Sequence, residues 1–299
     1  RFFANAYRVV RGAIQWQHGA KNRGSRSFEQ NSVDVMNMRR VALGLRYDGA
    51  NYHGWQYQED SLPTVQLAVD RAISNVANHV IHTVCAGRTD ARVHATSQVI
   101  HFDTDAERTT DAWVFGSNSN LPHDIVVMWA KEVSRDFHAR FSAKARRYRY
   151  LIYNSPVRSG ILRHAVGWYH KPLDIEVMQK AAHSLIGEHD FSSFRGSGCQ
   201  SNSPCRHLQE FNIERRGAMV LIELKANAFL LHMVRNLVGV LLLIGAGAKP
   251  ENWAEEVLHA RDRRQAAMTF SPNGLYLVEV DYPNEFDIPV NPIGPFFLS

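Results

Sequence analysis

The stretch AGRTDARVHA, residues 86–95, joins two segments of strand character and carries one aspartate between two arginines. Apolar residues 84–86 lead into it, and the alternating segment 98–102 follows it. Gly87 opens the loop, and the flanking arginines favour the ionised carboxylate of Asp90. Such a carboxylate can act as a nucleophile or as an electrostatic stabiliser. An ordinary ion pair in a loop is the alternative interpretation from spacing alone.

The segments around this loop mix strand and helix patterns without a regular strand–helix–strand alternation. Strands are expected over residues 40–46, 84–86, 98–102, 125–133, 145–153, 208–214, 219–224 and 275–280. Helices are expected over residues 62–80, 112–115, 175–186, 228–245 and 253–260, with Gly116 ending the second of them. This order predicts an α+β fold, with a mixed or antiparallel sheet flanked by helices and two α/β halves around a central active-site cleft. We expect the halves to be residues 38–145 and 146–299.

The positive charge of the chain is concentrated at its N-terminal end. The 299 residues carry 34 basic and 29 acidic side chains, a formal net charge of +5. Residues 1–37 contain six basic and two acidic side chains, so +4 of that total lies there and +1 remains for residues 38–299. A basic balance favours an acidic partner such as nucleic acid. We expect residues 1–37 to be a non-native or disordered extension, with a transit peptide or an RNA-binding arm as alternatives.

Several classes of protein are disfavoured by composition and motif. Three cysteines, an odd number, favour a reducing compartment, and we expect a cytoplasmic protein. The most apolar stretch, residues 237–244, is too short to span a membrane and predicts a buried helix. Cys199 and Cys205 lack a second pair for zinc, and residues 188–190 are more typical of a solvated helix end than of a metal site. No nucleotide-binding glycine motif is present. We therefore expect no metal and no cofactor.

Beyond the central loop, further motifs follow in a fixed order along the chain. GRTD at 87–90 and VHA at 93–95 are accompanied by matching stretches at residues 47–56, 121–125, 137–143, 147–150, 190–194, 199–201, 227–236 and 274–277. Over about residues 38–299 the sequence resembles the tRNA pseudouridine synthase A family. The resemblance implies a homodimeric isomerase that converts uridine to pseudouridine at positions 38–40 of the tRNA anticodon stem-loop. It also implies that no cofactor is required.

The resemblance assigns roles to individual residues. Asp90 would be the nucleophile, attacking uracil C6 or ribose C1′. Arg235 would pair with Asp90, and Tyr148 would stack on the uracil and help to remove its C5 proton. Arg88 would help to hold the flipped-out base, since a base inside a stem must leave its stack before it can react. From pattern alone, Tyr148 is more typical of a half-buried strand position and Arg235 of a helix-edge salt bridge.

The resemblance also predicts where tRNA is bound. The predicted contacts are Phe137, His138, Ala139, Arg140, Phe141, Gly198, Cys199, Gln200, Ser201, Asn202 and Arg108. Residues 131–149 contain seven basic and two acidic side chains, a local charge of +5. Basic residues interleaved with aromatic ones suit backbone contact combined with base stacking. A solvated polar face is the alternative.

One position departs from the family motif. Arg92 stands two residues after Asp90, where the family usually has glycine. Glycine there suggests a backbone with φ > 0, which costs another residue about 1–2 kcal/mol. Arg92 would then crowd the substrate or add a phosphate contact, and we expect activity to survive in an altered form. A non-catalytic RNA-binding protein and an aspartate-dependent glycosidase are the rival hypotheses. The glycosidase would need a second carboxylate, which no residue near Asp90 suggests.

Overall fold

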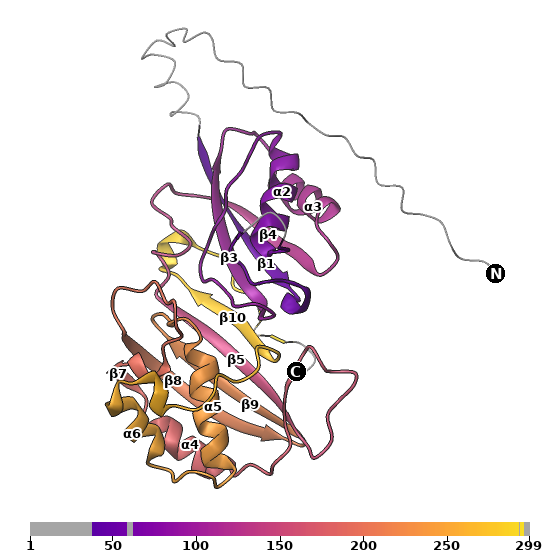
Figure 1. Ribbon diagram of the computed structural model, residues 1–299. Helices are drawn as coiled ribbons and strands as arrows, with labels where there is room; N and C mark the ends of the chain where they lie inside the picture. Colours follow the sequence, from indigo (N-terminus) through magenta and orange to yellow (C-terminus); the bar gives the residue numbers. More distant parts are fainter. Residues whose placement is uncertain (1–37, 59–61, 293, 296–299) are drawn as a thin grey trace, which may run out of the picture. The chain divides into compact units, whose positions relative to one another are not determined.

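The computed structural model describes residues 38–58, 62–292 and 294–295 of the chain, so the extension predicted over residues 1–37 lies outside the described residues. The strands in this part are β1 (Arg39–Tyr47), β2 (Val84–Cys85), β3 (His94–Thr104), β4 (Ile125–Val133), β5 (Ala145–Asn154), β6 (Gly167–Tyr169), β7 (Gly187–Asp190), β8 (Cys205–Arg216), β9 (Met219–Ala226) and β10 (Leu275–Asp281). The helices are α2 (Val65–Ala77), α3 (Thr110–Asn120), α4 (Ile175–His183), α5 (Met233–Gly245) and α6 (Trp253–Ala260) (Figure 1).

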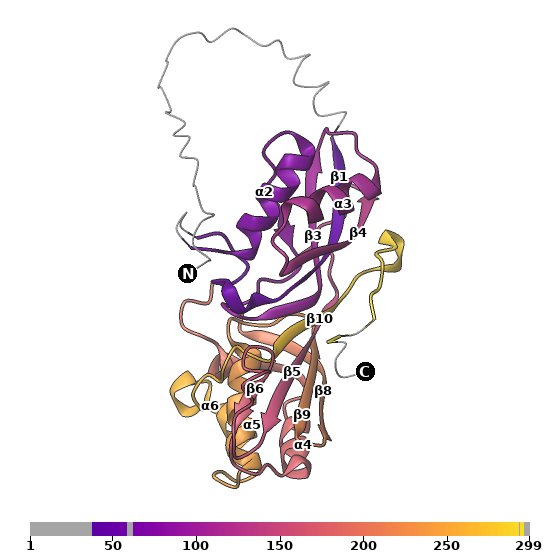
Figure 2. The ribbon, with the colours of Figure 1, turned by 90° about the vertical axis from the view of Figure 1, so that its right-hand side faces the viewer.

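These strands form one mixed sheet. Its order is β4-β1-β3-β10-β5-β9-β8-β7, with β2 paired to β3 and β6 paired to β5. The β10–β3 and β5–β6 pairs are parallel, and the other pairs are antiparallel. Helices α2 and α3 lie beside β1, β3 and β4, whereas α4, α5 and α6 lie beside β5, β8 and β9 (Figures 1 and 2). The predicted α+β class, a mixed sheet flanked by helices, is confirmed.

The last strand, β10, occupies the middle of this sheet. It pairs in parallel with the start of β3, where Tyr276 lies opposite His94. On its other side it pairs with β5, where Leu277 lies opposite Tyr148. A strand from the C-terminal end of the chain therefore places the start of β3, four residues after Asp90, close to the strand that carries Tyr148.

Helix α5 forms the most apolar part of the core. Most of its residues from Leu237 to Ile244 are less than 3% exposed, as expected for a buried helix. Burying such side chains contributes about 1.5–3 kcal/mol each. None of the helices among the described residues is long and apolar enough to cross a membrane.

Four local predictions were wrong or incomplete. Helix α3 continues through Gly116 instead of ending there. A Cβ at this position would lie 3.0 Å from Cγ2 of Val76, so the glycine allows α3 to approach α2. Helix α5 begins at Met233 rather than at residue 228, because His232 adopts φ +61°. Residues 188–190 belong to strand β7, which pairs with β8, and not to a helix end. Strand β6 was not predicted, since three residues carry too little periodicity.

Candidate active site

A cleft of about 1100 Å³ brings together several segments that are distant in sequence. The loop predicted to be reactive contributes residues 87–91, and strand β5 contributes Arg146 and Tyr148. The loop 198–201 and the segment 228–235, which runs into α5, also line the cleft, together with residues 55–58 before α2. The structure thus places Asp90, Tyr148 and Arg235 in the same cleft, as predicted from the sequence.

Asp90 and Arg235 form an ion pair inside the cleft. Nη1 of Arg235 donates to Oδ2 of Asp90 at 3.0 Å, and the two side chains are 14% and 17% exposed, respectively. Arg235 lies in the first turn of α5, and its Nε donates to the carbonyl oxygen of Phe270 at 2.8 Å. The guanidinium is therefore held at two points. Partial burial makes this charge-assisted contact stronger than a surface pair.

Tyr148 lies beside this pair on the cleft face of β5. Side chains alternate along a strand, so Arg146 and Tyr148 share one face while their neighbours point to the other. Burial, and then the negative charge of Asp90, raise the pKa of the Tyr148 phenol. The phenol is thus protonated at neutral pH and can donate a hydrogen bond. Its ring meets that of Phe229 edge to face, with centroids 5.1 Å apart.

His232 also faces Asp90, and the sequence analysis assigned it no role. Its Nε2 lies 3.6 Å from Oδ2 of Asp90, and its side chain is 34% exposed in the cleft. The spacing of His232 and Arg235 at the start of the apolar segment was the signal that could have identified it.

The opposite side of the cleft is formed by the 198–201 loop. Nη1 of Arg88 donates to Oε1 of Gln200 at 3.2 Å, so the reactive loop and this loop are in contact. Arg195 stabilises this loop, because its Nη2 donates to the carbonyl oxygens of Cys199 at 2.6 Å and Ser201 at 2.8 Å. Of the predicted residues in this region, the cleft lining comprises Gly198, Cys199, Gln200 and Ser201 but not Asn202.

Predictions for the 137–141 segment need correction. The side chains of Phe137 and Ala139 are fully buried, so they anchor the segment and cannot contact a ligand. Phe137 packs against Tyr282, with ring centroids 5.0 Å apart. Arg140 and Phe141 are exposed, and the Arg140 guanidinium lies 5.4 Å from the centre of the Phe141 ring. Arg140 also lines the cleft.

Two histidines shape the same segment. Nδ1 of His138 lies 3.2 Å from the backbone N–H groups of Arg140 and Phe141 and accepts from them. Nδ1 of His101 accepts from the backbone N–H of Ala139 at 3.1 Å. Burial, with the nearby positive charge of Arg40, lowers the pKa of His101 to about 4. His101 therefore stays neutral near pH 7 and remains an acceptor.

Arg108, another predicted contact, is not part of the cleft lining. Its Nε donates to the carbonyl oxygen of Val76 at 3.0 Å, in the last turn of α2. Basic side chains at this position satisfy carbonyl groups that the helix leaves without a partner. Arg108 therefore caps a helix in this structure.

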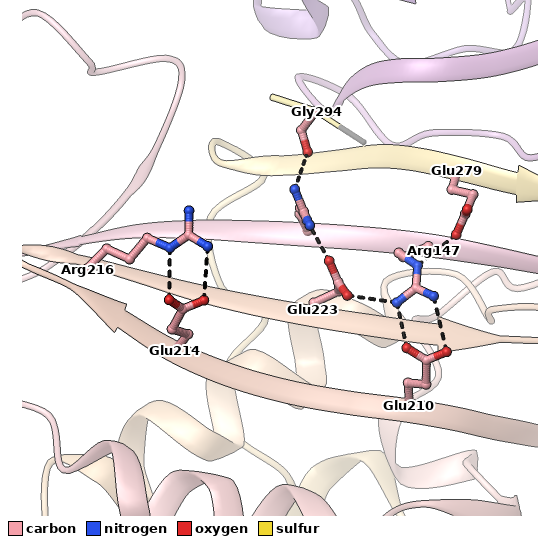
Figure 3. A network of polar contacts seen from close by, with 8 residues as sticks. Arg147, Glu210, Glu214, Arg216, Glu223, Glu279 and Gly294 are labelled. Carbon is pink, nitrogen blue, oxygen red and sulfur yellow. Dashed lines mark hydrogen bonds and ion pairs between the residues drawn. The ribbon is translucent and has the colours of Figure 1, made fainter. Parts of the chain in front are cut away.

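Three of the seven basic residues in the predicted positive cluster over residues 131–149 pair with acidic residues from other parts of the chain. Arg147 contacts Glu210 at 2.6 Å, Glu223 at 2.7 Å and Glu279 at 2.7 Å (Figure 3). Arg149 contacts Glu223 at 2.5 Å, and Lys131 contacts Asp287 at 2.6 Å. A charge sum over residues 131–149 misses these acidic partners, because the glutamates lie later in the chain, on strands β8, β9 and β10.

Arg146 is buried and binds backbone rather than a carboxylate. Its guanidinium donates to Ala86 at 2.8 Å, Asn227 at 2.9 Å and Ala143 at 3.2 Å, and also to the carbonyl oxygen of Arg140. It thereby ties together three segments that border the cleft. Burial disfavours the charged form of Arg146 and lowers its pKa. These hydrogen bonds offset the cost of removing the charged guanidinium from water.

Arg92 has the backbone expected where the family has glycine. Its φ is +67°, in the left-handed region. Its Nη2 lies 3.1 Å from Nδ1 of His164, whose carbonyl oxygen lies 2.8 Å from Nε2 of His94. Arg92 is not among the residues that line the cleft, which argues against crowding of the substrate.

The described part of the chain contains no side-chain cluster suited to binding a metal ion. No group of three or more His, Cys, Asp or Glu side chains there could hold a metal ion. Among the described residues that line the cleft, Asp90 is the one carboxylate, whereas a glycosidase would need two.

Comparison with known proteins gives a consistent result. A family model described as tRNA pseudouridine synthase matches residues 45–142 and 181–283. A protein of Coxiella burnetii named tRNA pseudouridine synthase A is 61% identical over 261 residues, covering 87% of this chain and 100% of the relative. Proteins of the same name are 54% identical in Pseudomonas aeruginosa, covering 87% of this chain and 91% of the relative, and in Klebsiella pneumoniae, covering 87% and 96%.

Proposed function

The chain belongs to the tRNA pseudouridine synthase family, and from this premise we propose that it converts uridine to pseudouridine at positions 38–40 of the tRNA anticodon stem-loop. It is an isomerase of the tRNA pseudouridine synthase A type. The observation that supports a catalytic role most directly is Asp90, held in the cleft by Arg235 and adjacent to Tyr148.

The proposed reaction exchanges one bond to ribose for another. The C1′–N1 bond breaks, C1′ bonds to C5, the C5 proton is lost and N1 gains a proton. No electrons are gained or lost overall, so a carboxylate nucleophile that is later released is sufficient. Asp90 is proposed to attack C6 of uracil or C1′ of ribose. The first half, residues 38–145, supplies Asp90 and Arg88, and the second half, residues 146–299, supplies Tyr148 and Arg235.

The target base is proposed to leave the stem and enter the cleft. Flipping costs a few kcal/mol, which contacts to the displaced base must offset. Tyr148 lines the cleft and is proposed to stack on the base, although it is only 8% exposed in this structure, and Arg88 is an exposed residue of the same lining. The hydrogen bond between Arg88 and Gln200 would break when the base enters the cleft, since both residues line it.

Binding of tRNA is proposed to use exposed side chains around the cleft. Arg140 and Phe141 combine a cation with an aromatic ring, a pairing that suits a phosphate next to an unstacked base. A tRNA substrate implies a cytoplasmic enzyme. We also propose a homodimer, for which light scattering should give twice the chain mass of 34.0 kDa.

The test is direct mapping of the product. The enzyme is incubated with unmodified tRNAs that carry uridine at 38, 39 or 40, and pseudouridine is located by carbodiimide labelling and primer extension. Product confined to these positions is expected. Product at other positions would overturn the site assignment, and tRNA binding without product would favour a non-catalytic RNA-binding protein.

Replacing Arg92 by glycine should alter tRNA binding more than folding. Relief of about 1–2 kcal/mol of backbone strain is offset by the entropy of glycine and by the lost contact to His164. We therefore expect an unfolding free energy within about 1 kcal/mol of the parent in urea titrations.

If Arg92 contacts a phosphate, the slope of log affinity against log salt should become shallower by about one. Filter binding at several salt concentrations measures this slope. Activity should survive. Parent-like rate, affinity and salt slope in the Arg92→Gly variant would show that Arg92 has no part in binding.

Removing residues 1–37 should leave the reaction largely unchanged, although +4 of the net charge lies there. The family match begins at residue 45, after this segment, so we expect rate and affinity within about twofold of the full chain. Single-turnover rates and filter binding at equal salt provide the comparison. A collapse of tRNA affinity would instead identify the segment as an RNA-binding arm.

A further inference from the structure

Two side chains converge on a single oxygen of Asp90. Arg235 Nη1 lies 3.0 Å from Oδ2, and His232 Nε2 lies 3.6 Å from the same atom. Within residues 38–58, 62–292 and 294–295, neither a hydrogen bond nor an ion pair reaches Oδ1. One oxygen is thus held by the protein, and the other is available to a substrate.

The backbone of His232 is in a conformation that histidine seldom adopts. It lies at φ +61°, ψ 3°, immediately before the first turn of α5. Such positions persist when the surroundings impose them, and they cluster at active sites. Glycine would adopt this conformation more easily, yet the chain carries an imidazole there.

The neighbouring loop is built to accommodate the imidazole. The backbone N–H of Gly196 donates to the carbonyl oxygen of Leu231 at 2.8 Å, which fixes the residue before His232. A Cβ on Gly196 would lie 2.8 Å from Nδ1 of His232 and 3.0 Å from that carbonyl oxygen. The absence of a side chain at Gly196 therefore leaves room for the ring, which then faces Asp90.

We propose that His232 is a positioning residue for the reaction: with Arg235 it fixes Oδ2 of Asp90 so that Oδ1 is the attacking atom. A single donor leaves a carboxylate free to turn about that hydrogen bond, whereas two groups converging on Oδ2 define its plane. The contact of 3.6 Å is slightly longer than a hydrogen bond, and catalytic contacts commonly shorten once substrate is bound. This inference rests on the proposed pseudouridine synthase activity.

Two variants separate positioning from structure. His232→Gly removes the ring and suits the left-handed backbone, and His232→Gln places an amide N–H close to the position of Nε2. The readout is single-turnover release of tritium from C5 of uridine in unmodified bulk tRNA, which does not depend on the position modified. For His232→Gly we expect a rate about 10²-fold lower, an unchanged tRNA dissociation constant and a melting temperature that is not lowered.

The glutamine variant should recover the rate to within about fivefold of the parent. Arg261→Gly is the matched control, because Arg261 also has positive φ, +49°, and lies outside the cleft lining. Its rate should equal that of the parent. A parent-like rate in His232→Gly, a defect confined to tRNA affinity, or a folded glutamine variant as slow as the glycine variant would overturn the role of His232. No release by the parent would overturn the proposed function as well.

Discussion

Asp90→Asn is expected to form no detectable pseudouridine, a loss of at least about 10⁴-fold in single-turnover rate. The amide preserves the volume of the side chain but cannot attack carbon. Its neutral charge also leaves Arg235 without its ionic partner at 3.0 Å. We expect tRNA affinity within about threefold of the parent, because Asp90 is a small part of a cleft of about 1100 Å³.

The matched control for this variant is Asp262→Asn. Asp262 also pairs with an arginine, Arg264 at 2.8 Å, but it lies outside the cleft lining. It should retain the parent rate, because an exposed pair contributes at most about 1 kcal/mol to stability. Equal product from Asp90→Asn and the parent would reject Asp90 as the nucleophile.

Arg146→Met is expected to lower the free energy of unfolding by at least about 4 kcal/mol. Methionine fills a similar volume but leaves the carbonyl oxygens of Ala86, Asn227, Ala143 and Arg140 without their donor. Each buried acceptor left without a partner costs about 1–3 kcal/mol. Urea titration followed by circular dichroism measures the loss. Activity should fall too, because Ala86 directly precedes the reactive loop.

Two further variants serve as comparisons for the stability of Arg146→Met. Arg146→Lys should recover part of the stability, since an ammonium reaches fewer of these carbonyls than the planar guanidinium does. Arg216→Met removes an arginine whose ion pair with Glu214, at 2.9 Å, is half-exposed, and should cost less than about 1 kcal/mol. If Arg146→Met were as stable as Arg216→Met, the backbone contacts of Arg146 would not be structural supports.

Prediction from sequence succeeded where the signal is local. Strand periodicity located β1 and β4 to within one residue at each end, and the apolar run from residue 237 located the core of α5. The motif around residues 87–95 pointed to a loop that lines the cleft in the structure. The glycine expected two residues after Asp90 implied positive φ, and Arg92 adopts it.

Predictions from the sequence failed where the surroundings of a side chain depend on residues that are distant in the sequence. Arg147 and Arg149 look available for RNA in sequence, but they face glutamates that follow 63 to 132 residues later. Phe137 appears as a stacking residue and is instead enclosed by Tyr282 and Phe286. The start of α5 was placed five residues early, because its apolar pattern continues through a segment that the left-handed His232 separates from the helix.

The sequence by itself therefore determined the class of fold through side-chain periodicity, and its resemblance to a known family predicted the loop around Asp90 and the residues expected to react there. The tertiary structure alone decided that His232 lies at the same oxygen of Asp90 as Arg235, more than 140 residues away in the sequence. It also decided which positive charges remain exposed for RNA. The first depends on strand β10 joining β3 to β5, and the second on the pairing of β5 with β9 and of β9 with β8, contacts between distant segments that no local pattern encodes.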